Sequence, residues 1–273
     1  MHKVYFFITF LCVCLGASAE SQYIRLVDRA DKAIADGDYK QAIALLGEAL
    51  RTEPDNSGNV MLLSNIGMLH YYTGNDSLAI HTLSLAHDIA PQSVTILSNR
   101  AKVLKETGHY AAAIRDYDTI IAIDSTLYAP HLHKGVIYLS AGDTEAASTE
   151  LRRVETMTDA TKSLECSAAL AWLASMTDNR DDALKYYSAL INLEPSAEFY
   201  AARAMCYVNQ ENYPDASTDI AEAIRLDPDC AEIYVARACL NKKMYRNDDS
   251  LSDAQKAIEL GADSRRVRSL LNL

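Results

Sequence analysis

The chain has 273 residues, of which 49% are apolar and 23% are charged, and its formal net charge is -11 at pH 7. This acidic balance argues against nucleic acid as a partner and against electrostatic docking on an anionic membrane, because both require a basic surface. A chain of this length ordinarily forms one or two globular domains, unless it consists of repeats that stack in one dimension.

The first 19 residues have the pattern of a secretory signal peptide. Lys3 supplies a positive start, residues 4–15 are almost wholly apolar, and residues 17–19 form the small triplet Ala-Ser-Ala. We predict cleavage after Ala19, which leaves no integral membrane segment in the mature chain. The sequence therefore predicts an exported protein, with the periplasm favoured and the cell surface or secretion as alternatives.

A small residue then returns every 33 to 37 residues, at Ala42, Ala79, Ala113, Ala147, Ala183, Ala216 and Ser250. A period of this size indicates stacked supersecondary units rather than one globular core. The seven predicted units are 23–56, 60–93, 94–127, 128–161, 164–197, 197–230 and 231–264. A short capping helix is predicted at 265–273.

Each unit is predicted to contain two helices, because apolar residues recur at helical spacing on both sides of a turn. Four of these turns carry glycine at the same place, where a residue that tolerates positive φ ends the first helix: Gly37, Gly74, Gly108 and Gly142. The last three units have Asp178, Glu211 and Tyr245 at that place. We expect the turns of these three units to be less sharply defined.

The repeats resemble those of the tetratricopeptide repeat family. The resemblance rests on Gly67 and Gly135 where helices would touch, on the turn at residues 37–39, on the repeated alanines and on the Leu-Asp-Pro ending at residues 226–228. It implies an all-α fold, a right-handed α-solenoid of about seven helix-turn-helix repeats. The seventh repeat is the weakest, with Asn241 and Ser250 at places that are usually apolar or small.

Opposite charges occur together, sixteen residues apart, at the same two places in four units. The pairs are Arg100 with Asp116, Lys134 with Glu150, Arg203 with Asp219 and Arg237 with Asp253. A cation on the first helix that faces a carboxylate on the second would hold the hairpin together. A row of catalytic carboxylates is the disfavoured alternative, because catalysis needs groups that converge on one point.

The resemblance also implies a concave groove lined by the first helix of each repeat. The groove residues that we predict to bind a peptide are Asn65, Asn99, His133, Tyr71, Lys102, Lys105 and Trp172. Asparagine can donate and accept hydrogen bonds at once, which suits an extended peptide backbone. Solvated surface residues are the alternative for the two asparagines, and burial in the core is the favoured alternative for Trp172.

We find no sequence signature of an enzyme, a metal site or a cofactor site. His131 and His133 are two residues apart, so they diverge on a helix and make a poor pair of metal ligands. Cys166, Cys206, Cys230 and Cys239 remain after the signal, and we expect small buried residues more than a disulfide.

The sequence thus predicts a non-catalytic scaffold that binds a protein or peptide segment in its groove. The alternative is a structural subunit of an envelope complex that assembles through its terminal repeats or its convex face. The partner and the oligomeric state are left open.

Overall fold

The computed structural model describes residues 21–272, which form fifteen α-helices, one short 3-10 helix and no strand. The predicted all-α fold of paired helices is therefore confirmed. The predicted signal peptide, residues 1–19, lies outside the described residues. None of the described helices is long and apolar enough to cross a membrane. The chain divides into two compact units at Val103, and each unit is described by itself.

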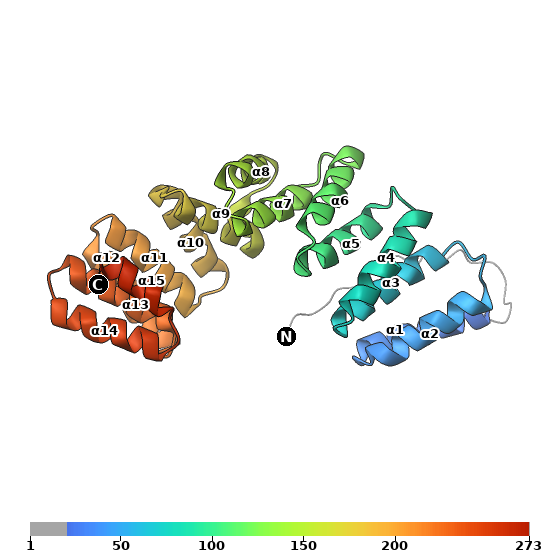
Figure 1. The fold of residues 1–273 in the computed structure, drawn as a ribbon, viewed down its shortest axis with the longest axis horizontal. Helices are drawn as coiled ribbons and strands as arrows, with labels where there is room; N and C mark the ends of the chain where they lie inside the picture. The colour runs from blue at the N-terminus through green and yellow to red at the C-terminus, as the bar shows by residue number, and fades with distance from the viewer. Residues whose placement is uncertain (1–20, 273) are drawn as a thin grey trace. The chain divides into compact units, whose positions relative to one another are not determined.

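The first unit contains two complete helix hairpins and most of a fifth helix (Figure 1). Its helices are α1 (Gln22–Ala35), α2 (Tyr39–Thr52), α3 (Asn59–Tyr72), α4 (Asp76–Ile89) and α5 (Val94–Glu106) as far as Val103. Helix α1 packs on α2 and α3 packs on α4, and α2 and α3 connect the two hairpins.

The second unit contains a first helix, four complete hairpins and a terminal helix. Its elements are α6 (Tyr110–Ile123), α7 (Ala129–Ser140), α8 (Thr144–Met157), η1 (Ala160–Lys162), α9 (Leu164–Met176), α10 (Arg180–Leu193), α11 (Ala197–Asn209), α12 (Tyr213–Leu226), α13 (Ala231–Lys243), α14 (Asn247–Glu259) and α15 (Ser264–Leu271). Successive first helices pack side by side, as α7 on α9 and α11 on α13. The 3-10 helix η1 precedes α9 and packs on α9 and α10.

Polar residues set where many of the helices begin. The side chain that precedes the first turn accepts a hydrogen bond from a backbone N–H of that turn at Ser21, Asp38, Asp143, Ser163, Asn179, Ser196 and Asp263. These bonds satisfy donors that the helix itself leaves without partners. Several helix starts are therefore encoded locally in the sequence.

The turns within the seven hairpins share one geometry, which corrects the expectation for the last three. Gly37, Gly74, Gly108 and Gly142 have φ near +78°, and Asp178, Glu211 and Tyr245 adopt φ of +50°, +60° and +61°. In each hairpin the residue after this position donates its N–H to a carbonyl five residues earlier, as Asp143 does to Tyr138 and Asn179 does to Ala174. This bonding pattern ends the first helix whether or not glycine is present, so the non-glycine turns are strained rather than loose.

Small residues occupy the places where the two helices of a hairpin approach most closely. The recurrent alanines from Ala42 to Ala216 are almost wholly buried. A Cβ on Gly67 would lie 2.6 Å from Leu83 Cγ, and one on Gly135 would lie 2.6 Å from the Leu151 side chain. A larger residue would therefore separate the helices, which is why the period of small residues defines the fold.

The seventh hairpin is fully formed, although its sequence matches the family pattern least. Asn241 is buried and donates to Asp253 Oδ2 at 2.9 Å, and the Ser250 hydroxyl donates to the Ala238 carbonyl at 2.8 Å. The polar residues at these places are thus satisfied inside the hairpin. Helix α15 then packs on α13 and α14 and buries Val267 and Leu271.

Candidate interaction surfaces

In the first unit, tyrosines and a lysine gather at the end of α3. The rings of Tyr71 and Tyr72 lie 5.5 Å apart, and Tyr39 lies 6.0 Å from Tyr72. The Lys102 ammonium lies 5.8 Å from the centre of the Tyr72 ring, within the range of a cation–π interaction. Tyr71 and Lys102 were predicted from the sequence, whereas Tyr39 and Tyr72 were not.

The two predicted asparagines differ in what they contact. Asn99 donates from Nδ2 to the hydroxyl of Ser64 at 3.0 Å, and Ser64 is fully buried. Asn65 is half-buried and makes no side-chain hydrogen bond within residues 21–272. Asn99 therefore connects α3 to α5, while Asn65 keeps both its donor and its acceptor for a ligand.

In the second unit, the predicted residues Lys105 and His133 already have partners. Lys105 is half-buried, and its Nζ lies 3.0 Å from Glu106 Oε1. The ring of His133 lies 5.4 Å from that of Tyr117, and its Nδ1 lies 3.7 Å from Glu165 Oε1. These two side chains line the surface, but intramolecular contacts already fix them in place.

Trp172 is 41% exposed, so the favoured prediction that it lies in the core is wrong. It belongs to a row of exposed apolar residues along α9, at four-residue intervals: Leu164, Ala168, Trp172 and Met176. The opposite side of α9 is also apolar and packs into the core through Leu170, Leu173 and their neighbours. A helix that is apolar on all sides is ordinarily covered on all sides. Leu164 and Met176 were not among the residues predicted from the sequence.

The predicted cation–carboxylate pairs of the second unit lie in contact. Lys134 Nζ is 2.7 Å from Glu150 Oε1. Arg203 donates to both oxygens of Asp219 at 2.8 and 2.7 Å, and Arg237 does the same to Asp253 at 2.9 and 2.6 Å. Of the remaining pair, Arg100 lies half-buried on α5 in the first unit and Asp116 lies buried on α6 in the second.

The Lys134 pair is part of a larger network that the sequence did not indicate. Lys134 also contacts Asp118 Oδ1 at 2.7 Å, and Glu150 Oε2 lies 2.6 Å from His131 Nδ1. Burial opposes charge on both groups, yet hydrogen bonds from His131 and Lys134 lower the pKa of Glu150, and bonds to Asp118 and Glu150 raise the pKa of Lys134. His131 is thus a buried structural residue that points away from the place of His133.

Residues 21–272 contain no cluster of three or more side chains that could hold a metal ion. Cys166, Cys206, Cys230 and Cys239 are free thiols. Burial raises the pKa of Cys206 to about 11 and also raises the pKa of the other three. The thiols are therefore protonated at neutral pH, which makes them poor nucleophiles.

A cavity of about 350 Å³ lies beside the terminal helix of the second unit. Its walls come from α11, α13 and α15, and include Met205, Cys239 and Lys242. Leu270 is 45% exposed at its rim. The capping helix thus contributes to a surface hollow besides covering the last hairpin.

Comparisons with known proteins agree with this arrangement. The profile of the tetratricopeptide repeat family matches residues 168–229. A tetratricopeptide repeat protein from Parabacteroides merdae has a similar crystal structure, with 25% identity, a TM-score of 0.65, and coverage of 92% of this chain and 97% of that one. The chain is built from tetratricopeptide repeats. Its period, its paired helices and its small contact residues are those of tetratricopeptide repeats.

Two further matches show the range of similar proteins. Human sperm-associated antigen 1 is 25% identical over 94% of this chain and 32% of its own length. YrrB, described as a protein with an unusual peptide-binding site, is 17% identical with a TM-score of 0.59, and the match covers 70% of this chain and 98% of YrrB. The chain spans about a third to two-fifths of the first curated relatives that it matches.

Proposed function

We propose that this tetratricopeptide repeat protein is a non-catalytic scaffold that binds an extended segment of a partner protein across its first helices. The observation that carries the proposal is the exposed apolar row on α9, formed by Leu164, Ala168, Trp172 and Met176. An exposed apolar row of this length is typical of interaction sites. YrrB, a protein of similar fold that is described as having a peptide-binding site, supports the same class of function.

Trp172 is suited to anchor such a segment. Tryptophan is enriched among the residues that dominate binding energy, because its large ring excludes water over a wide area. The helices of the repeat hold the ring in place before binding, so little conformational freedom is lost on the scaffold side. The segment would then gain its affinity from apolar side chains laid along α9.

In the first unit, Asn65 and Lys102 provide polar contacts of the kind that a peptide backbone needs. Asn65 can donate to a carbonyl and accept from an N–H. Lys102 is exposed, and its ammonium lies over the Tyr72 ring. We include Tyr71 on this surface, and we assign Asn99 to the support of Ser64 rather than to direct binding.

The test is a crosslinked pull-down from the native cell envelope with Trp172→Ala and with Leu193→Ala. Leu193 is a matched control, because it is 44% exposed but lies on α10. We expect a partner that is lost with Trp172→Ala and kept with Leu193→Ala. Trp172 is the only tryptophan of the chain. Binding of the purified partner should therefore also shift the fluorescence of Trp172. A partner retained equally by both variants would overturn the proposal.

Asn65→Ala tests the first-unit contacts without disturbing the fold. We expect weaker capture of a partner that binds the first unit, with an unchanged circular dichroism spectrum. Asn99→Ala serves as the structural comparison, because it leaves the buried Ser64 hydroxyl without its donor and should lower the thermal midpoint.

We further propose that the protein is exported, with residues 1–19 as its signal peptide. Mass spectrometry of the protein from its native host should then find Glu20 as the first residue. An intact N-terminus in a cytoplasmic fraction would contradict export while leaving the scaffold proposal in place.

The second candidate function is assembly of an envelope complex through the C-terminal end. It is favoured by the exposed Leu270 beside the terminal cavity and by Tyr245, which is 90% exposed. Leu270→Ser in the same pull-down separates the two functions. Loss of partners with Leu270→Ser but not with Trp172→Ala would support assembly.

A further inference from the structure

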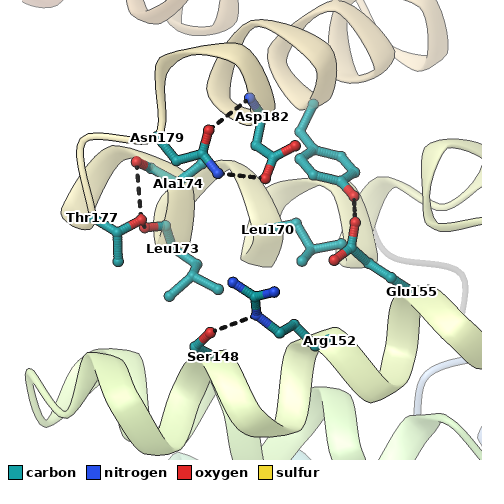
Figure 2. Close-up of a pocket in the computed structure, with 10 residues that line it drawn as sticks. Ser148, Arg152, Glu155, Leu170, Leu173, Ala174, Thr177, Asn179 and Asp182 are labelled. Atoms are coloured by element: carbon teal, nitrogen blue, oxygen red, sulfur yellow. Dashed lines mark hydrogen bonds between the residues drawn. The ribbon is translucent and has the colours of Figure 1, made fainter.

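A second cavity lies within the second unit, between α8, α9 and α10, away from the exposed row on α9. Its volume is about 310 Å³. Leu170, Leu173 and Ala174 of α9 form an apolar wall, and the remaining lining residues are polar: Ser148, Arg152, Glu155, Thr177, Asn179, Asp182 and Tyr186. Figure 2 shows these side chains converging on a shared space from the three helices. This cavity was not predicted from the sequence.

The cavity coincides with a departure from the repeat pattern. Glu155 stands eight residues after Ala147. Five of the other six units have an apolar residue at this place, namely Leu50, Ile121, Ile191, Ile224 and Ile258, and the sixth has His87. Those residues are buried or half-buried. The Glu155 carboxylate instead accepts from the Tyr186 hydroxyl, and Lys185 Nζ lies 3.5 Å away. At this place Glu155 thus replaces the apolar side chain of the other repeats, and its carboxylate contacts Tyr186 in the cavity wall.

Arg152 carries a positive charge that has no ion-pair partner among residues 21–272. It stands five residues after Ala147, and the equivalent residues are Gly47, Ser84, Asp118, Ser188, Ala221 and Gln255, none of them cationic. Its Nε donates to the Ser148 hydroxyl at 3.0 Å. No carboxylate in residues 21–272 forms an ion pair with it, and Figure 2 shows its guanidinium directed into the cavity.

The two acidic residues of the cavity are already engaged. Glu155 is balanced by Lys185 and by the Tyr186 donor. Asp182 accepts from Asn179 Nδ2 at 2.6 Å and lies in the first turn of α10, where the helix dipole stabilises a negative charge. The terminal NH₂ groups of Arg152 therefore remain as the polar groups that a ligand would satisfy.

We propose that this cavity binds a carboxylate carried by a short apolar group. The carboxylate would accept hydrogen bonds from the Arg152 guanidinium, which is shaped for a carboxylate, and the apolar group would cover Leu170, Leu173 and Ala174. The volume is at the lower end of the range of about 300 to 1,000 Å³ for ligand pockets, so it accepts one residue-sized group. The carboxylate can belong to a free organic acid or to the terminus of a peptide.

The test is a titration of the full chain, labelled with ¹⁵N, with N-acetyl-leucine as the probe. For a ligand of this size we expect a Kd on the order of 1 mM and amide shifts confined to α8, α9 and α10. N-acetyl-leucinamide has the same apolar group without the charge and should bind about tenfold more weakly or worse. A peptide that ends in leucine distinguishes the sources, because tighter binding than N-acetyl-leucine assigns the site to peptide termini and weaker binding to free acids.

Two variants and one control locate the site. Arg152→Gln should weaken N-acetyl-leucine binding about tenfold or more, whereas Arg153→Gln, an exposed neighbour on α8 outside the cavity, should not change it. Glu155→Ile restores the residue that other repeats have and should abolish binding by filling the space, although it removes a negative charge. Equal affinities for Arg152→Gln and Arg153→Gln, full binding by Glu155→Ile, equal binding of acid and amide, or no shift at about ten times the expected Kd would each overturn the proposal.

Discussion

The hairpins α7–α8 and α9–α10 are built to the same plan, yet they fill one central place in opposite ways. In α7–α8 the facing residues are Lys134 and Glu150, whereas in α9–α10 the equivalent residues are Leu170 and Tyr186. The charged pair is held by hydrogen bonds inside a network. The uncharged pair packs through apolar contacts, and the Tyr186 hydroxyl donates a hydrogen bond to Glu155 on α8.

This difference shows how a repeat can acquire a local feature without changing its fold. The buried charges of Lys134 and Glu150 are satisfied by each other, by His131 and by Asp118 of α6, so they leave no group for a ligand. Leu170 and Tyr186 carry no charge that needs a partner inside the protein. The hydrogen bond of Tyr186 to Glu155 lies at the boundary between α9–α10 and the preceding hairpin. The cavity lined by Arg152 occurs at that boundary.

The largest effect is expected from Glu150→Ala in the charged hairpin. It leaves Lys134 and His131 without their shared acceptor, and we expect a loss of about 2–3 kcal/mol in the free energy of unfolding, since Lys134 keeps Asp118. Urea unfolding followed by circular dichroism measures this. The control is Asp118→Ala, whose side chain is 56% exposed and which should cost less than about 1 kcal/mol. Equal losses would mean that burial of the pair is unimportant.

In the uncharged hairpin, Tyr186→Phe should cost about 1 kcal/mol. The hydroxyl loses its bond to the partly exposed Glu155 and the bond that it accepts from the exposed Lys185, while the ring still packs on its neighbours. Tyr187→Phe is the matched control, since the Tyr187 hydroxyl contacts the exposed Ser175 at 3.2 Å. We expect a smaller change for Tyr187→Phe in the same urea experiment. A loss for Tyr186→Phe as large as that of Glu150→Ala would erase the contrast between the two hairpins.

The two hairpins should also differ in their response to pH. The pKa of Glu150 is lowered in the folded state, so its stabilisation is present above its ordinary pKa and is lost as pH falls through the folded value. The pKa of Lys134 is raised, and burial raises that of Tyr186 to about 12, so both hairpins lose stability in strong alkali. The charged hairpin therefore loses stability in acid as well as in alkali.

Glu150→Gln reveals the acid effect. The difference in unfolding free energy between wild type and Glu150→Gln should be constant near neutral pH and should shrink as pH falls below about 4. Urea unfolding at a series of pH values measures it. A difference that stays constant down to the acid limit of folding would show that Glu150 contributes no charge-dependent stability.

The smallest effect concerns the turns of the two hairpins, Gly142 and Asp178. Both residues have positive φ, at +76° and +50°, which is strained for aspartate. Asp178→Gly should raise the thermal midpoint by about 2 °C, and Gly142→Asp should lower it by a similar amount. The exposed contact of Asp178 with Arg180 contributes little against this gain. A lower midpoint for Asp178→Gly would show that this contact outweighs the backbone strain.

Much of the fold follows from the sequence because its determinants are local. Helices and turns are encoded by apolar spacing, by capping residues and by the small residues at contact places such as Ala147. The interval of sixteen residues between Lys134 and Glu150 corresponds to one fixed hairpin geometry, so a regular spacing predicts which side chains face each other. The shared conformation of the turns at Gly142 and Asp178 was missed, because the hydrogen bond that closes the hairpin outweighs the preference of a single residue.

The candidate surfaces depend on what neighbouring helices cover, and a single sequence does not record this. Only the tertiary structure shows that Trp172 lies on the open side of α9, that Asn99 is used by Ser64, and that Glu155 turns to Tyr186 beside an unpaired Arg152. The sequence by itself determined the repeats, their helices and the charges that hold them together, because these depend on contacts within one hairpin. The tertiary structure decided which side chains remain available to a ligand, because exposure depends on contacts between hairpins.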